Sequence, residues 1–159
     1  RSGEDRKDQL GDHAGRGGYF LHLMIVQHDK TKFRQGRGKM MNSVCFFEIP
    51  ADDLDGLLKF YGELFGWTFE AVPGKFRYYS INMGDQTIKG GMTARQDDTH
   101  TPVNYVRVES LDAARDRAVS LGAKVVVSRG SVPGAGWYAV LLDPQGNRIG
   151  LWQEDRNAG

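Results

Sequence analysis

Residues 44–67, VCFFEIPADDLDGLLKFYGELFGW, change from a strand pattern to a helix pattern within one short segment. Residues 44–49 form an apolar, aromatic-rich run, which is typical of a buried strand. Pro50 then ends the run, because proline cannot donate to a sheet ladder. The segment therefore predicts a short buried strand that leads directly into a helix.

The helix that follows has recognisable ends. Asp52 or Asp53 supplies an N-cap, and Gly66 supplies a C-terminal stop. Between them, apolar residues recur at three- and four-residue spacing, which places them on one helix face. They are Leu54, Leu57, Leu58, Tyr61, Leu64 and Phe65. We expect this face to pack against the sheet.

Three further strands complete a first unit. They are predicted over residues 67–72, 76–83 and 86–94, and the dipeptides Pro73-Gly74 and Gly84-Asp85 separate them as turns. The order of elements is therefore strand, helix and three strands, or βαβββ.

The same order returns in the second half of the chain. Residues 103–109 alternate as a strand, Ser110 caps a helix and Gly122 stops it. The helix has a seam of Leu111, Ala114, Ala118 and Leu121. Three strands follow, over residues 124–128, 137–142 and 148–153, and Asp143–Asn147 form a strong turn. The glycine-rich segment 130–136 is either an ordinary loop or a lid.

The predicted fold class is α+β, with tandem βαβββ units over residues 42–95 and 102–155 inside a domain of residues 41–155. Residues 156–159 form a tail. Residues 1–40 hold nine Lys and Arg against five Asp and Glu and contain clustered glycines. We interpret residues 1–40 as a flexible extension: a tag, upstream sequence or a native arm for a partner.

Composition excludes several classes of function. Lys and Arg number 21 against 20 Asp and Glu, which is too balanced for a strong nucleic-acid surface. No apolar run is long enough to span a membrane. The one cysteine, Cys45, cannot form an internal disulfide, and Cys/His spacings typical of a zinc site are absent. We therefore expect a cytoplasmic protein.

The tandem arrangement resembles the vicinal oxygen chelate superfamily, which includes glyoxalase I, bleomycin resistance proteins and extradiol dioxygenases. The residues that carry the resemblance are Phe60-Tyr61, Phe65-Gly66-Trp67, Leu121-Gly122-Ala123 and Asp143–Asn147. It implies two curved sheet halves that enclose a cleft, usually in a homodimer. In active members, three or four side chains in this cleft hold a divalent metal.

The positions where the resemblance places metal ligands carry Phe46, Gly91, Tyr105 and Gly150. None is a good ligand, so we expect neither a metal nor another cofactor. We do not expect His100 to replace these missing ligands, because we interpret it as a solvated residue of the loop between the units.

The residues that remain in the expected cleft predict a binding site for a flat, aromatic or anionic small molecule. The candidate ligand-binding residues are Phe46, Glu48, Thr93, Tyr105, Arg107 and Trp152. Gly91 and Gly150 should leave space, and Cys45 should point away from Phe46. Glu48 and Arg107 occupy equivalent places in the two units. They either form an ion pair, or Arg107 binds a ligand anion, or Glu48 accepts a proton.

These features favour a metal-independent protein that binds or sequesters a small molecule in the manner of a bleomycin resistance protein. We assign no catalytic residue. One alternative is a metal-dependent lyase, isomerase or dioxygenase of the glyoxalase type. The other is a regulatory domain that binds a partner through residues 1–40.

Overall fold

The computed structural model describes residues 41–73, 77–84 and 88–159. The predicted extension, residues 1–40, lies outside them, and so do parts of the turns after Pro73 and Gly84. The elements are β1 (Val44–Ala51), α2 (Leu54–Phe65), β2 (Thr68–Ala71), β3 (Tyr78–Asn82), β4 (Lys89–Ala94), β5 (Val103–Arg107), α3 (Leu111–Ser120), β6 (Lys124–Val132), β7 (Gly136–Leu142) and β8 (Arg148–Glu154). This order confirms the predicted tandem βαβββ units.

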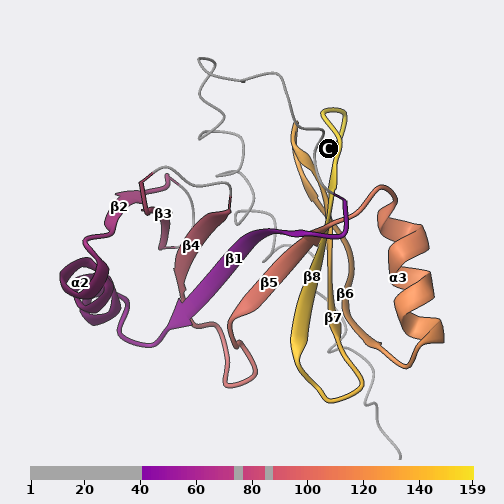
Figure 1. The fold of residues 1–159 in the computed structure, drawn as a ribbon, viewed down its shortest axis with the longest axis horizontal. Helices are drawn as coiled ribbons and strands as arrows, with labels where there is room; N and C mark the ends of the chain where they lie inside the picture. The colour runs from indigo at the N-terminus through magenta and orange to yellow at the C-terminus, as the bar shows by residue number, and fades with distance from the viewer. Residues whose placement is uncertain (1–40, 74–76, 85–87) are drawn as a thin grey trace, which may run out of the picture.

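One eight-stranded mixed sheet contains all the strands, in the order β2-β3-β4-β1-β5-β8-β7-β6 (Figure 1). In each unit the first strand runs parallel to the last, β1 beside β4 and β5 beside β8. The two units join where β1 pairs antiparallel with β5, with Phe46 opposite Tyr105. The units therefore pair within one chain.

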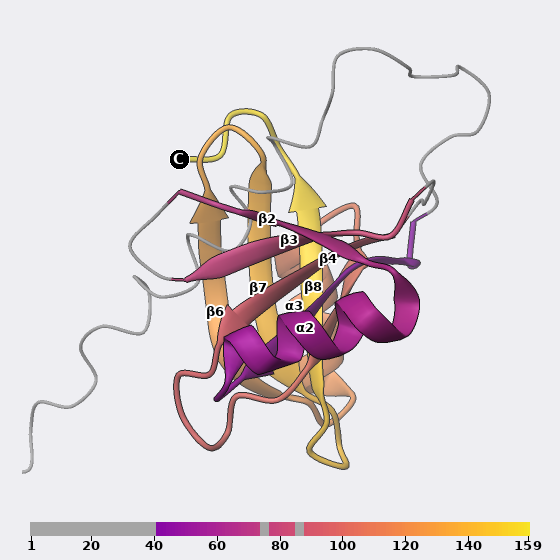
Figure 2. The ribbon, with the colours of Figure 1, turned by 90° about the vertical axis from the view of Figure 1, so that its left-hand side faces the viewer.

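The two helices lie on the outer flanks of the curved sheet (Figures 1 and 2). The buried Leu54 of α2 packs with Ile81 and Met92, and the buried Leu111 of α3 packs with Ala139 and Leu141. The opposite sheet face, here called the inner face, carries a third buried cluster. Its members are Cys45, Phe46, Tyr78, Val103, Tyr105, Val132, Tyr138, Val140 and Trp152. These side chains come from both units, so the inner face joins the two halves.

Local capping signals explain the helix ends. The Asp53 carboxylate accepts a hydrogen bond from the Gly56 N–H at 3.0 Å, and the Ser110 hydroxyl accepts one from the Ala113 N–H at 3.3 Å. Gly66 ends α2 in the left-handed conformation, with a φ of 69°, and Gly122 adopts a φ of 99° after α3.

Three details differ from the sequence-based expectations. β1 continues through Pro50 to Ala51, because its pairing with β5 has ended at Glu48 and the missing N–H costs no bond there. β6 extends to Val132, so most of the glycine-rich segment 130–136 belongs to strands. Leu64 and Phe65 are more than half exposed and do not pack against the sheet.

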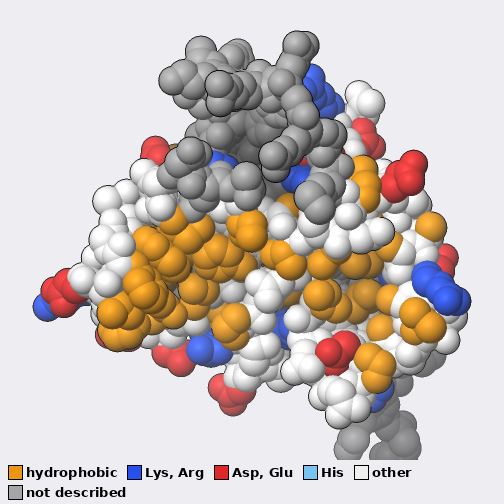
Figure 3. Space-filling view, in the orientation of Figure 1, with side chains coloured by type: hydrophobic (Ala, Val, Ile, Leu, Met, Phe, Trp, Pro, Cys, Tyr) orange, Lys and Arg blue, Asp and Glu red, His pale blue; other side chains and the backbone are white. Residues whose placement is uncertain are grey.

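Apolar side chains gather on the flank that carries α2 (Figure 3). Phe60, Leu64 and Phe65 are each more than half exposed there. Within the described residues, neither helix has the length and apolar character needed to cross a membrane.

The end of α2 allows a matched test of the conformation of Gly66. Gly66→Ala should lower the free energy of unfolding by about 1 kcal/mol, because alanine is strained at positive φ. Gly62→Ala, inside the same helix with ordinary contacts around the new Cβ, should instead raise it by about 0.5–1 kcal/mol. Urea unfolding of both variants measures the difference, and equal effects would contradict this account of the helix end.

Candidate functional site

Large aromatic side chains pack directly against glycines on the inner face. Tyr78 covers Gly91, Tyr105 covers Gly150, Tyr138 covers Gly130 and Trp152 covers Gly136. A Cβ atom at any of these glycines would overlap the ring that covers it. The expectation that Gly91 and Gly150 leave open space is therefore wrong, because tyrosine side chains fill both places.

The structure brings five of the six predicted ligand-binding residues onto the inner face. Phe46 and Tyr105 meet at its centre in an edge-to-face contact, with ring centroids 6.1 Å apart. Trp152 and Glu48 are buried on the same face. Thr93 is also buried, and its hydroxyl donates to the Arg77 carbonyl oxygen at 3.4 Å.

The sixth residue, Arg107, does not meet Glu48. The Arg107 Nε atom donates to Glu154 Oε1 at 3.2 Å. Since β1 and β5 run antiparallel, Glu48 lies opposite Val103, and Arg107 lies four residues further along β5, roughly 13 Å away along the strand. Of the three alternatives for Glu48 and Arg107, the ion pair is therefore wrong.

The partner of Glu48 is His100. Its Nε2 atom lies 3.3 Å from Glu48 Oε1, and the two residues are only 9% and 6% exposed. The backbone N–H of Gln96 points to the other ring nitrogen, Nδ1, at 3.4 Å. Because Nδ1 accepts this bond, Nε2 carries the hydrogen and donates it to the carboxylate. His100 is a buried hydrogen-bond donor, and its interpretation as a solvated loop residue is wrong.

The segment between β4 and β5 places His100 against Glu48. Asp97 accepts a hydrogen bond from the Thr99 N–H at 2.8 Å, which turns the chain back, and the Arg95 guanidinium donates to the His100 carbonyl oxygen. Arg95 also pairs with Asp52 at 3.0 Å, and Arg148 of β8 donates to the Thr99 hydroxyl at 3.1 Å. Both units therefore hold this segment in place. In the sequence, the Asp97–Thr99 turn pattern is the one local signal for the path of this segment.

Glu48 is a carboxyl group held in an aromatic environment. Burial raises its pKa, and the hydrogen bond from His100 partly opposes that rise. The Tyr78 hydroxyl also donates to Glu48. Burial and the nearby Glu48 charge together raise the pKa of Tyr138 to about 12. An ionised Glu48 therefore lies close enough to act electrostatically on a side chain of β7.

Two buried polar atoms on this face have no hydrogen-bond partner among the described residues. They are the Tyr138 hydroxyl and the Trp152 indole N–H. Both side chains are at most 2% exposed. A buried donor without a partner costs about 1–3 kcal/mol, so a bound group with an acceptor atom would be stabilised here.

Cys45 packs in the inner-face cluster together with Phe46. The pairing of β1 with β5 shifts register between Val44 and Phe46, which turns Cys45 to the same side. The expectation that Cys45 points away from Phe46 is wrong. Burial raises the pKa of its thiol, and its Sγ donates to the Tyr105 carbonyl oxygen at 3.4 Å.

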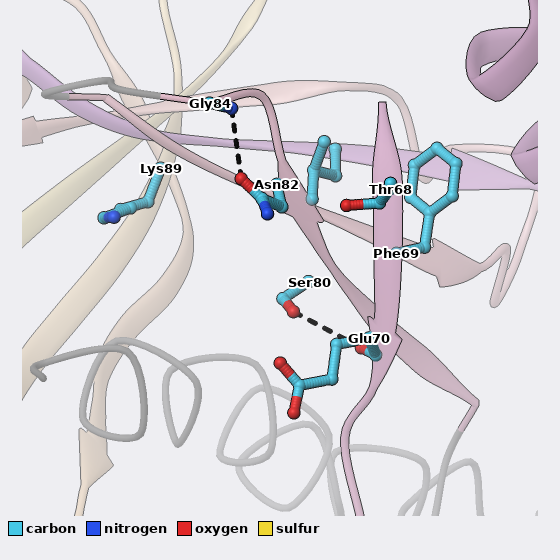
Figure 4. Close-up of a pocket in the computed structure, with 8 residues that line it drawn as sticks. Thr68, Phe69, Glu70, Ser80, Asn82, Gly84 and Lys89 are labelled. Atoms are coloured by element: carbon cyan, nitrogen blue, oxygen red, sulfur yellow. Dashed lines mark hydrogen bonds between the residues drawn. The ribbon is translucent and has the colours of Figure 1, made fainter. Parts of the chain in front are cut away.

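A cavity of about 180 Å³ lies at the end of the sheet formed by β2, β3 and β4 (Figure 4). Its lining includes Thr68, Glu70, Ser80, Asn82 and Lys89. Across the strands, Glu70 pairs with Ser80, Ser80 with Gly91, and Gly91 with Glu48. The cavity therefore continues the inner face beyond Tyr78. Its volume suits one small polar group rather than a whole ligand.

The side chains of the inner face do not fit a divalent metal. Phe46 and Tyr105 supply rings at two of the expected ligand positions, and Tyr78 and Tyr105 cover the glycines at the other two. Within the described residues, no three His, Cys, Asp or Glu side chains come together. Glu48 and His100 bond to each other and would supply only two protein side chains, fewer than the three or more protein ligands of typical metal centres.

Comparisons with known proteins agree with this fold. A family model described as a glyoxalase-like domain matches residues 44–152. CFP32 of Mycobacterium tuberculosis, named as a candidate glyoxylase, is 28% identical over 141 residues, which cover 82% of this chain and 50% of that protein. DnrV of Streptomyces peucetius, named an anthracycline biosynthesis protein, is 27% identical over 128 residues, 69% of this chain and 46% of that one. The chain thus spans about half the length of these curated relatives.

Two solved structures share the fold at low sequence identity. Methylmalonyl-CoA epimerase from Mycobacterium tuberculosis has a TM-score of 0.56 and 18% identity, and the match covers 77% of this chain and 95% of that one. The Mn(II)-bound glyoxalase from Novosphingobium aromaticivorans has a TM-score of 0.54 and 16% identity, over 75% of this chain and 40% of that one. At these identities the similarity establishes the fold alone.

The raised pKa of Glu48 predicts how stability depends on pH. Above the ordinary value near 4.5, the native carboxyl still holds its proton while the unfolded one has lost it, so stability falls as pH rises through this window. The Glu48→Gln variant lacks this fall in stability with rising pH. The unfolding free energy of the variant relative to wild type should therefore rise with pH, by at most about 1.4 kcal/mol per unit, and then level off.

Urea unfolding between about pH 4 and pH 8 measures this difference. Glu154→Gln is the control, since that carboxylate lies at the other end of the inner face beside Arg107. If the unfolding free energy of Glu48→Gln relative to wild type instead falls as the pH rises, the raised pKa of Glu48 is contradicted.

Proposed function

Because this chain belongs to the glyoxalase-like family of the vicinal oxygen chelate superfamily, we propose that it binds a flat, aromatic small molecule on the inner face of its sheet without a metal. One observation carries the proposal: aromatic rings fill all four positions where the resemblance places metal ligands. The same rings provide a surface on which a planar molecule stacks favourably.

The polar groups of the inner face support a ligand that is only partly apolar. Tyr138 and Trp152 offer an O–H and an N–H that lack partners, and Glu48 offers a carboxylate. The name of DnrV connects one relative with anthracyclines, which are fused-ring aromatic compounds. We therefore take a fused-ring aromatic molecule with polar substituents as the ligand class.

The proposed mode of action is binding or sequestration, as in a bleomycin resistance protein. Arg107, the residue that we expected to bind an anion, is engaged by Glu154. The metal-dependent alternative would need donor atoms that the described part of the inner face does not bring together. No specific contact favours that alternative.

We also propose that the protein is a cytoplasmic homodimer. The exposed Phe60, Leu64 and Phe65 on α2 support contact with another protein surface, because apolar patches of this kind mark interaction sites. The buried Cys45 thiol supports a reducing compartment. Light scattering that gives the mass of a single chain at micromolar concentration would contradict the dimer.

The fused-ring ketone 6-acetyl-2-naphthol is a suitable probe of the proposed function. We expect one equivalent to bind with a Kd on the order of 10 μM, and to quench tryptophan fluorescence because Trp152 lies on the inner face. The affinity should be the same in EDTA as in added Mn²⁺ or Ni²⁺. No binding, or binding that requires the metal, would overturn the proposal.

Tyr138→Phe separates ligand binding from stability. Removal of a buried hydroxyl without a partner should raise the unfolding free energy of the free protein by about 1 kcal/mol, and should weaken probe binding about five- to tenfold. Tyr79→Phe is the matched control, because Tyr79 packs on the side of α2. It should change neither quantity by more than about 0.5 kcal/mol. Unaltered probe affinity in Tyr138→Phe would contradict the assignment of this hydroxyl.

A further inference from the structure

The polar groups of the inner face are arranged as donors on one side and an acceptor on the other. The donors, Tyr138 and Trp152, come from the neighbouring strands β7 and β8 of the second unit. The acceptor, Glu48, comes from β1 of the first unit. We propose that Glu48 determines ligand specificity by accepting a hydrogen bond from a hydroxyl group, while Tyr138 and Trp152 donate to a carbonyl group of the same ligand. This inference rests on the proposed function and names the ligand class: a hydroxylated aromatic ketone.

The Glu48 carboxylate has acceptor capacity to spare. A carboxylate offers about four lone-pair sites. His100 and Tyr78 donate to it, which leaves about two sites unused. A buried carboxylate is costly unless its acceptor sites are satisfied, so a ligand hydroxyl that reaches it gains a charge-assisted bond.

His100 acts as a positioning residue. Its Nδ1 atom accepts from the Gln96 N–H, so Nε2 donates to Glu48 Oε1 and orients the carboxyl group. The Arg95 guanidinium donates to the His100 carbonyl oxygen and so fixes the backbone that carries the ring. The carboxylate therefore meets a ligand in a fixed orientation, which is what discrimination between similar ligands requires.

The charges around this face disfavour an anionic ligand. Burial, and after it the nearby Glu48 charge, raise the pKa of the Tyr78, Tyr105 and Tyr138 hydroxyls, so a further negative charge beside them would be disfavoured. Of the neighbouring cations, Arg107 is paired with Glu154, whereas Arg148, which donates to the Thr99 hydroxyl, partly opposes the rise in the pKa of Glu48 and of Tyr105. We therefore take a neutral ligand in preference to the anionic alternative that the sequence left open.

Three probes of one ring system test the inference: 6-acetyl-2-naphthol, its methyl ether and 6-acetyl-2-naphthoate. Fluorescence titrations at about pH 7.5 give the three Kd values. In the wild-type protein the naphthol should bind at least about tenfold tighter than the ether, which has no hydroxyl hydrogen, and the naphthoate should bind weakest. In Glu48→Gln the preference for the naphthol over the ether should fall below about threefold, and the naphthoate should bind more tightly than in wild type.

Two further variants separate specificity from general damage. His100→Ala should reduce the preference for the naphthol, and His100→Gln should restore part of it, because the glutamine amide still donates an N–H. Glu154→Gln should leave the preference unchanged, since Glu154 contacts Arg107 at the far end of β5. Circular dichroism and urea unfolding verify that each variant is folded.

The outcomes distinguish the inference from the proposed function. If none of the three probes binds, the proposed function fails. If the naphthol and its ether bind equally in wild type, or if their ratio is the same in folded Glu48→Gln, only the inference is overturned. The combination of a wild-type preference, its loss in Glu48→Gln and its partial rescue in His100→Gln supports it.

Discussion

The inner face depends on a steric match between aromatic rings and glycines on adjoining strands. Tyr105 lies on Gly150 only because that residue has no Cβ, and Tyr78 lies on Gly91 for the same reason. Tyr138 and Trp152, which pack against Gly130 and Gly136 in the same way, are almost completely buried. The same packing fills the places where related proteins are expected to hold metal ligands. The aromatic character of the proposed binding surface and the lack of a fitting metal-donor set among the described residues therefore follow from the same packing.

Among the described residues, Glu48 is the buried carboxyl group of this face. Glu48 lies among aromatic side chains, and a buried carboxylate of this kind persists only when it is well hydrogen-bonded. His100 meets that need because Arg95 and the Asp97–Thr99 turn fold the connecting segment back over the end of β1. The connection between the two units therefore does more than join them: it completes the polar part of the candidate site.

Local signals explain why much of the fold could be predicted from the sequence. Asp53, Ser110 and Gly66 act on their own helix ends, so their roles follow from nearest neighbours. The partners of Glu48 and Arg107 could not be predicted, since they depend on strand register and on the path of the loop. The packing of Tyr105 on Gly150 likewise joins residues that meet only through the pairing of β5 with β8.

Diffraction from crystals grown with excess Mn²⁺ and measured for anomalous scattering tests the central claim most directly. The steric account predicts electron density for the Tyr78 and Tyr105 rings over Gly91 and Gly150, and no anomalous peak on the inner face. An anomalous peak for a metal ion bound to Glu48 or His100, with the tyrosine rings displaced from the glycines, would contradict it.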